Sequence, residues 1–163
     1  MRRARSPAAG LLLAVLTASP HPLAAQQRSR VVEWGVHTTI TVVDSARAAL
    51  VAGPRFAVRS VGGTRLALSL GAGVLRGQAT GRGEAAIEYL VTPRAAGRLS
   101  VYGGGGLAGV VGEGNGGYLL IYVGVERSPG LPAGWAIEAG VGGGYRIRAA
   151  WHWRRFPPWW RPR

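Results

Sequence analysis

The sequence predicts an all-β fold, namely an antiparallel up-and-down transmembrane β-barrel of about eight strands that follows an N-terminal signal peptide. Three observations predict this fold. Several stretches alternate apolar and polar residues with a period of two, glycine-rich sequences typical of turns separate these stretches, and the first 25 residues have the pattern of an export signal. No part of the remaining chain shows a convincing helical period of about 3.6 residues.

The composition is consistent with one domain and excludes several kinds of site. A chain of 163 residues with 47% apolar content is long enough to form a single packed body. The absence of cysteine excludes disulfides, thiolate nucleophiles and cysteine-ligated metals. All basic residues are arginine, and much of the formal net charge of +13 lies in the first five and last 18 residues. The intervening chain is only mildly basic, so we expect no nucleic-acid partner.

Residues 1–25 are predicted to be a cleavable signal peptide. Three arginines in the first five residues precede an apolar core at residues 8–18, and Pro20 and Pro22 interrupt any helix before Ala25. The core is too short to span a bilayer, so an uncleaved membrane anchor is the weaker alternative. Cleavage would leave a mature chain that begins at Gln26 and is exported by the general secretory route.

Seven segments show the two-residue period directly. In the first, Trp34 and Val36 lie on one face of the predicted strand, while Glu33 and His37 lie on the other. The segments cover residues 32–42, 55–59, 65–74, 82–91, 99–111, 118–126 and 135–141. Turn sequences separate them at residues 62–63, 77–81, 92–97, 112–117 and 128–134.

An eighth segment depends on how the glycines at residues 142–144 are interpreted. If they form a tight turn, residues 145–154 make a further strand with Tyr145 and Ile147 outward and Arg146 and Arg148 inward, ending at Phe156. The alternative is one long strand from Trp135 to Trp153, which would leave seven strands. We expect eight, because an even number places both chain ends on the same side of a membrane.

The polar face of these segments is sparse and carries charges of both signs among small residues. A narrow barrel needs such an interior, because its lumen must be filled by side chains and its buried charges must be paired. An apolar exterior with a polar interior is typical of a transmembrane barrel. The charges predicted to form a lumen network are Glu33, Arg55, Arg59, Arg65, Arg82, Glu84, Glu88, Glu126 and Glu138. The alternative is a secreted soluble β-barrel whose apolar face points inward and binds a small apolar ligand.

We expect no enzyme activity, cofactor or metal. Gly104, Gly106 and Gly109 match a dinucleotide-binding fingerprint in spacing, but the residues that follow cannot begin the helix that receives the pyrophosphate. His37 and Glu33 share a face, yet that face is the predicted lumen, whereas a lipid hydrolase places its triad toward lipid. Asp44 is the only aspartate, and the carboxylates show no clustered ligand set in the sequence.

Taken together, these features resemble the small bacterial outer-membrane β-barrel proteins of the OmpA/OmpX-like eight-stranded group. The resemblance rests on the signal peptide, about eight alternating segments, aromatic residues near strand ends and a final strand that ends at Phe156. It implies a barrel over residues 26–156, located in the outer membrane. The implied function is a non-catalytic structural or interaction role in the cell envelope. The group usually ends at the terminal aromatic residue, whereas this chain continues.

Residues 157–163 form a short tail rich in tryptophan, arginine and proline. Tryptophan favours the membrane interface and arginine pairs with lipid phosphates, so contact with outer-membrane lipid or anionic envelope components is one interpretation. The other is a disordered extension. The residues assigned to interface or lipid contact are Trp151, Trp153, Trp159, Trp160, Arg161 and Arg163. The oligomeric state is left open.

Overall fold

The computed structural model describes residues 30–44 and 47–163, so the predicted signal peptide and Gln26 lie outside the described residues. The described chain is all β-structure without a helix. None of its segments is a helix long and apolar enough to cross a membrane. The eight strands are β1 (Arg30–Asp44), β2 (Arg47–Ser60), β3 (Thr64–Leu75), β4 (Gln78–Leu90), β5 (Leu99–Gly112), β6 (Gly116–Arg127), β7 (Ala133–Val141) and β8 (Tyr145–Arg155).

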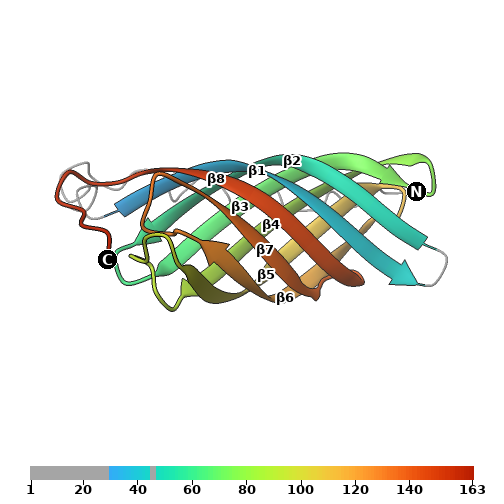
Figure 1. Cartoon of the computed structure of the whole chain (residues 1–163). Coiled ribbons are helices and arrows are strands. Elements are labelled where there is room, and N and C mark those ends of the chain that lie inside the picture. The colour runs from blue at the N-terminus through green and yellow to red at the C-terminus, as the bar shows by residue number, and fades with distance from the viewer. Residues whose placement is uncertain (1–29, 45–46) are drawn as a thin grey trace, which may run out of the picture.

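The strands close into a barrel in which each pairs antiparallel with the next and β8 pairs with β1 (Figure 1). This confirms the prediction of eight strands. The alternative of one long strand from Trp135 to Trp153 is wrong, because Gly143 and Gly144 both have positive φ and reverse the chain. The amide of Gly142 donates to the carbonyl oxygen of Gly144 at 3.0 Å and tightens this turn.

Strand β2 is longer than the sequence predicts, because it runs through Pro54 instead of beginning after it. Pro54 lies opposite Val36 on β1, whereas pairing with β3 is interrupted at Gly53 and Pro54 and resumes at Arg55 in the same register. Proline has no amide hydrogen to donate, so a gap in one ladder is the expected consequence. The ladder on the other side keeps the strand continuous.

The turn expected at residues 77–81 is shorter in the structure, where β4 already begins at Gln78. Arg76 and Gly77 alone connect β3 to β4, and both have positive φ. Two central residues with positive φ define a type I′ turn, whose twist matches that of the two strands. The glycines at positions 81 and 83 therefore belong to the barrel wall.

The alternation predicted from the sequence sorts side chains between the two faces of the wall. Apolar side chains point outward on all eight strands, and charged side chains point into the lumen. Between the strand ends, the described outward-facing positions carry apolar residues or glycine, with Thr38 as the exception. The exposed charged residues described lie at strand ends, in the connections or in the C-terminal segment.

The two ends of the barrel differ. At one end, here called the terminal end, lie the start of β1, the end of β8 and the connections β2–β3, β4–β5 and β6–β7. Residues 156–163, here called the C-terminal segment, turn back at this end (Figure 1, red). The opposite end, here called the turn end, carries the other four connections. The longest described connection, residues 91–98, belongs to the terminal end.

Candidate functional site

The lumen is filled by long polar side chains because small residues lie beside them on neighbouring strands. Gly104 is an example, since a Cβ atom there would lie 2.9 Å from Cγ of Glu88 and 2.9 Å from Cζ of Tyr122. Real Cβ atoms do not approach other atoms so closely, so glycine creates the room these side chains occupy. The glycines that match a dinucleotide fingerprint thus lie within strand β5. Gly104 and Gly106 leave no room for a Cβ atom, whereas a Cβ at Gly109 would meet nothing within 4 Å.

Arg65 is the centre of the charge network near the terminal end. Its guanidinium contacts three glutamates from three different strands. The Nη1 atom lies 3.0 Å from Glu33 and 2.8 Å from Glu126, and Nε donates to Glu88. Arg65 is completely buried, so these carboxylates replace the water that a guanidinium would otherwise require.

The network continues through the middle of the lumen by way of Glu88 and Glu138. Arg55 joins them, with Nη2 at 2.6 Å from Glu88 and Nη1 at 3.4 Å from Glu138. Two tyrosines add hydrogen bonds: the hydroxyl of Tyr122 donates to Glu88 at 2.6 Å, and that of Tyr102 donates to Glu138 at 3.0 Å. Each carboxylate therefore accepts bonds from both charged and neutral donors.

Toward the turn end, the network reaches Glu84. Arg146 connects the two levels, because it lies 2.7 Å from Glu138 and 3.5 Å from Glu84. Glu84 also pairs with Arg148 and with Nε of Arg82 at 2.6 Å. Arg82 donates through Nη2 to the carbonyl oxygen of Gly142 at 2.9 Å, which ties the charge network to the β7–β8 turn.

The structure brings together all nine charged residues that the sequence assigned to the lumen, and each is buried. The nine are Glu33, Arg55, Arg59, Arg65, Arg82, Glu84, Glu88, Glu126 and Glu138. The network also includes residues that this assignment left out: Arg146, Arg148, Arg154, Tyr102 and Tyr122. The alternation in residues 145–154 places the three arginines inward, so their presence in the lumen could have been predicted from the sequence.

Positive charge is in excess in the lumen. Among the described residues, seven buried arginines face five buried glutamates. Each of these arginines lies within ion-pair distance of at least one glutamate. Because the buried glutamates are fewer than the buried arginines, removal of one glutamate leaves buried positive charge without a negative partner.

His37 does not meet a serine and a carboxylate in the arrangement that a hydrolase needs. It is buried on the lumen side of β1. Two buried serines form hydrogen bonds elsewhere: Ser69 on β3 donates to Glu84 at 3.4 Å, and Ser100 on β5 accepts from the amide of Thr92 at 3.1 Å. Within the described chain, the geometry therefore gives no support to a nucleophilic triad.

Glu33, Glu126 and His152 form the one group of described side chains close enough together to hold a metal ion, with ligand atoms within 4.8 Å of one another. No sequence pattern indicates this cluster, because the three residues come from β1, β6 and β8. Arg65 and Arg154 already contact both carboxylates. Two adjacent guanidinium groups supply the positive charge that a cation would bring, and they would repel one.

The C-terminal segment covers the terminal end of the barrel. The ring of Trp160 stacks on Phe156 at 4.8 Å, and its indole nitrogen donates to the carbonyl oxygen of Gly130 at 3.1 Å. The guanidinium of Arg59 lies 5.8 Å from the centroid of the Trp160 ring. This arrangement links the segment to an arginine of the lumen network, so residues 156–160 act as a cap.

The two adjacent tryptophans of the tail have different surroundings. Trp160 is 7% exposed, whereas Trp159 is 45% exposed. The position of Trp160 differs from the interfacial one assigned from the sequence, because the segment turns at Pro157 and directs the ring under the loop that contains Gly130. Trp151 and Trp153 are exposed on the outer face of β8, and Arg161 and Arg163 are exposed beyond the cap.

These two tryptophans provide a matched test of the cap. We expect Trp160→Ala to lower the free energy of unfolding by about 2 kcal/mol, because it removes a cation–π contact, a stacked ring and a buried hydrogen bond. Trp159→Ala removes a ring of the same size from an exposed position and should have a much smaller effect. Denaturant titration of both variants measures the difference. Equal losses would mean that the segment does not cap the barrel.

Aromatic side chains gather on the outer wall near the terminal end. Trp34 on β1 lies opposite Phe56 on β2 and Trp153 on β8, and Trp135 on β7 lies opposite Trp151. Tyr89 near the end of β4 is also exposed. At the turn end, Tyr145 is the exposed aromatic residue of the described wall. The aromatic collar thus surrounds mainly one rim.

Fold and interior together define the class of the molecule: a closed eight-stranded antiparallel barrel with an apolar exterior and a lumen filled by paired charges. No family model matches the chain, and comparison with curated proteins gives no match. The features of the molecule that bear on its function are the wall, the lumen and the rim.

Proposed function

We propose that the protein is a non-catalytic β-barrel of the bacterial outer membrane with a structural or interaction role in the cell envelope, exported by the signal peptide at residues 1–25. The observation that carries this proposal is the outer wall. Its outward-facing positions between the strand ends are apolar or glycine on every strand, apart from Thr38. Water is a poor solvent for such a surface, and a contiguous apolar patch of this size is rare on soluble monomers.

The dimensions of the wall suit a bilayer. The strands contain 9 to 15 residues, and Figure 1 shows them strongly inclined to the barrel axis. About 9–11 residues of a tilted strand are sufficient to cross the hydrocarbon layer. The closed sheet leaves no strand edge unpaired, which lipid requires because it offers no hydrogen-bonding partner. The eight-strand closure also supports the resemblance to the OmpA/OmpX-like group, which we keep as part of the proposal.

The alternative of a secreted soluble barrel with a small apolar ligand requires apolar side chains around the interior. The described lumen instead holds arginine, glutamate and histidine beside a small apolar cluster that includes Leu90 and Leu120. The two buried tyrosines, Tyr102 and Tyr122, donate to glutamates. An apolar ligand would have to displace these ion pairs and leave buried charges unpaired. The orientation of the two faces therefore favours the membrane proposal.

The aromatic collar indicates where the membrane interface would lie. Tryptophan and tyrosine concentrate at the level of the lipid headgroups in membrane barrels. We therefore place the terminal end at an interface, with Trp151, Trp153 and Trp159 in contact with lipid and Arg161 close to it. Burial of Trp160 assigns that residue to the cap instead.

Membrane fractionation with a heat-modifiability assay tests this proposal. We expect the protein to sediment with outer membranes, to require detergent for extraction, and to run at a different apparent size when boiled, because a closed barrel resists unfolding by detergent. A helical periplasmic protein of similar size provides the control. Recovery of the chain as a soluble periplasmic monomer would contradict the proposal.

A filled lumen also predicts that the protein is not a pore. Eight strands give an interior just wide enough for side chains, and here the ion pairs run from Glu33 near the terminal end to Arg82 near the turn end. We expect no sustained conductance when the purified protein is added to planar bilayers, with a known porin as the positive control. Stable single-channel currents would show that the lumen opens or that an oligomer forms a larger channel.

A further inference from the structure

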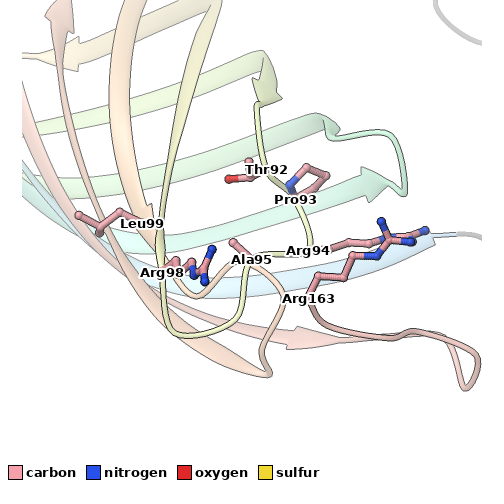
Figure 2. A pocket seen from close by; sticks show the side chains of 7 residues that line it. All are labelled: Thr92, Pro93, Arg94, Ala95, Arg98, Leu99 and Arg163. Carbon is pink, nitrogen blue, oxygen red and sulfur yellow. The ribbon is translucent and has the colours of Figure 1, made fainter.

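A basic pocket lies at the terminal end, outside the lumen. It has a volume of about 630 Å³ and is formed by the β4–β5 connection and the C-terminal segment (Figure 2). The residues that line it are Thr92, Pro93, Arg94, Ala95, Arg98, Leu99 and Arg163. Every charged side chain of this lining is an arginine.

These arginines differ from those in the lumen. Each buried arginine of the lumen pairs with a glutamate, whereas Arg94, Arg98 and Arg163 have no carboxylate partner within the described chain. Figure 2 shows the side chains of Arg94 and Arg163 extending in the same direction from the pocket wall. In the same view, the side chain of Arg98 lies on the other side of Ala95. The three arginines together give the pocket lining a positive charge, which attracts an anion.

The pocket is held in shape by backbone hydrogen bonds from two sides. The amide of Arg163 donates to the carbonyl oxygen of Arg94 at 2.8 Å, and the amide of Ala96 donates to a main-chain oxygen of Arg163 at 2.8 Å. From the other side, the amide of Gly130 donates to the carbonyl oxygen of Ala95 at 2.9 Å. The guanidinium of Arg94 also lies 5.3 Å from the centroid of the Trp160 ring. The site is therefore formed before any ligand arrives, which lowers the entropic cost of binding.

One side of the pocket is continuous with the apolar wall. Leu99 lines the pocket and is exposed. Val101 on the same strand and Val91, the first residue after β4, are exposed as well. The amide of Val91 donates to the carbonyl oxygen of Val101 at 3.0 Å, so these apolar side chains adjoin. A ligand that fits both features has an anionic head and apolar chains that extend along the wall.

We propose that this pocket binds the phosphate headgroup of an anionic glycerophospholipid, whose acyl chains lie against Leu99, Val101 and Val91. The inference rests on the proposed membrane location. Arginine is well suited to this role, because its planar donors match a phosphate and its charge persists at any physiological pH. The aromatic collar at the same rim would place the pocket at the level of the headgroups.

The test uses the full mature protein in zwitterionic detergent, titrated with phosphatidylglycerol and followed by native mass spectrometry. We expect Arg98→Gln to weaken binding roughly fivefold, and the triple variant with Arg94→Gln and Arg163→Gln to weaken it roughly a hundredfold, since each arginine near a lipid surface contributes about one such factor. The matched control is Arg155→Gln, an exposed arginine at the same end of the barrel but outside the pocket. It should bind within twofold of the parent.

Titration with other ligands distinguishes a phospholipid site from a general anion site. Phosphatidylcholine, which carries no net charge, should bind at least tenfold more weakly than phosphatidylglycerol. Equal binding of inorganic phosphate would make this a general anion site and would overturn the lipid assignment. Loss of binding in Arg155→Gln equal to that in Arg98→Gln would overturn the pocket itself, since diffuse surface charge would then explain the affinity.

This outcome is separable from that of the proposed function. If the protein fractionates with membranes but the arginine variants bind phosphatidylglycerol like the parent, the pocket assignment alone is wrong. If the protein is a soluble periplasmic monomer, the membrane proposal is wrong whatever the titration shows. Gel mobility without boiling verifies that each variant retains the barrel. The Arg98→Gln result does not depend on the stability of the cap, because Arg98 is exposed and makes no described side-chain contact with it.

Discussion

Glu88→Gln is expected to lower the free energy of unfolding by about 3–5 kcal/mol, the usual cost of removing one partner from a buried ion pair. Glu88 contacts Arg55 and Arg65 and accepts from the hydroxyl of Tyr122. The substitution preserves shape and removes one negative charge from a lumen that already has an excess of arginine. Urea titration of the protein in lipid vesicles, followed by circular dichroism, measures the change.

A matched control and a compensating variant show whether charge is the cause. Glu113→Gln makes the same substitution in the β5–β6 turn, outside the charge network, and should alter stability by less than about 0.5 kcal/mol. Adding Arg55→Met to Glu88→Gln removes one of the uncompensated cations. The double variant should therefore lose less free energy of unfolding than the two single variants lose together. A loss from Glu88→Gln no larger than that from Glu113→Gln would mean that the lumen ion pairs do not hold the barrel together.

Leu70→Arg is expected to lower the free energy of unfolding in lipid vesicles by about 2–4 kcal/mol, the cost of an arginine that faces lipid near the middle of a bilayer. Leu70 lies in the middle of β3 and is 66% exposed on the outer wall. The same arginine at an exposed position of a soluble protein would have almost no effect. Stability in lipid vesicles, measured by urea titration, therefore separates a membrane wall from a solvated one.

Val74→Arg controls for the chemistry of the substitution. Val74 is on the same strand and the same face, 48% exposed, but four residues closer to the turn end. Because the cost of a charge falls to about 0–1 kcal/mol near the interface, this variant should be tolerated much better than Leu70→Arg. Equal and small effects at both positions would indicate that the wall faces water.

The sequence was sufficient to predict which side of the wall each strand residue occupies. The period of two assigns a face residue by residue, and one face in this chain is almost free of charge, so the outward position of Leu70 and the inward position of Arg65 follow directly. The order of the strands also follows, because short connections join antiparallel neighbours. Strand ends were harder to predict. The first half of β2 contains small residues and Pro54, which weaken the pattern on both faces.

Contacts across the lumen could not be predicted in the same way. Arg65 meets Glu33 and Glu126 because closure of the sheet brings β1, β3 and β6 around one narrow space. Periodicity along a strand carries no information about which residues share a level inside the barrel. The cap could not be predicted for a similar reason. The burial of Trp160 depends on the carbonyl group of Gly130, which belongs to a loop distant in the sequence.

The central claim, that the apolar wall lies in lipid, is tested most directly by spin labels on single introduced cysteines. The chain contains no cysteine of its own, so each label reports one position. In lipid vesicles, labels at Leu70→Cys and Ile121→Cys should be accessible to oxygen, which concentrates in lipid, and shielded from a water-soluble nickel complex. Labels at Arg76→Cys and Asn115→Cys, in turns at the turn end, should show the reverse. Free access of the nickel complex to all four positions would contradict the membrane account.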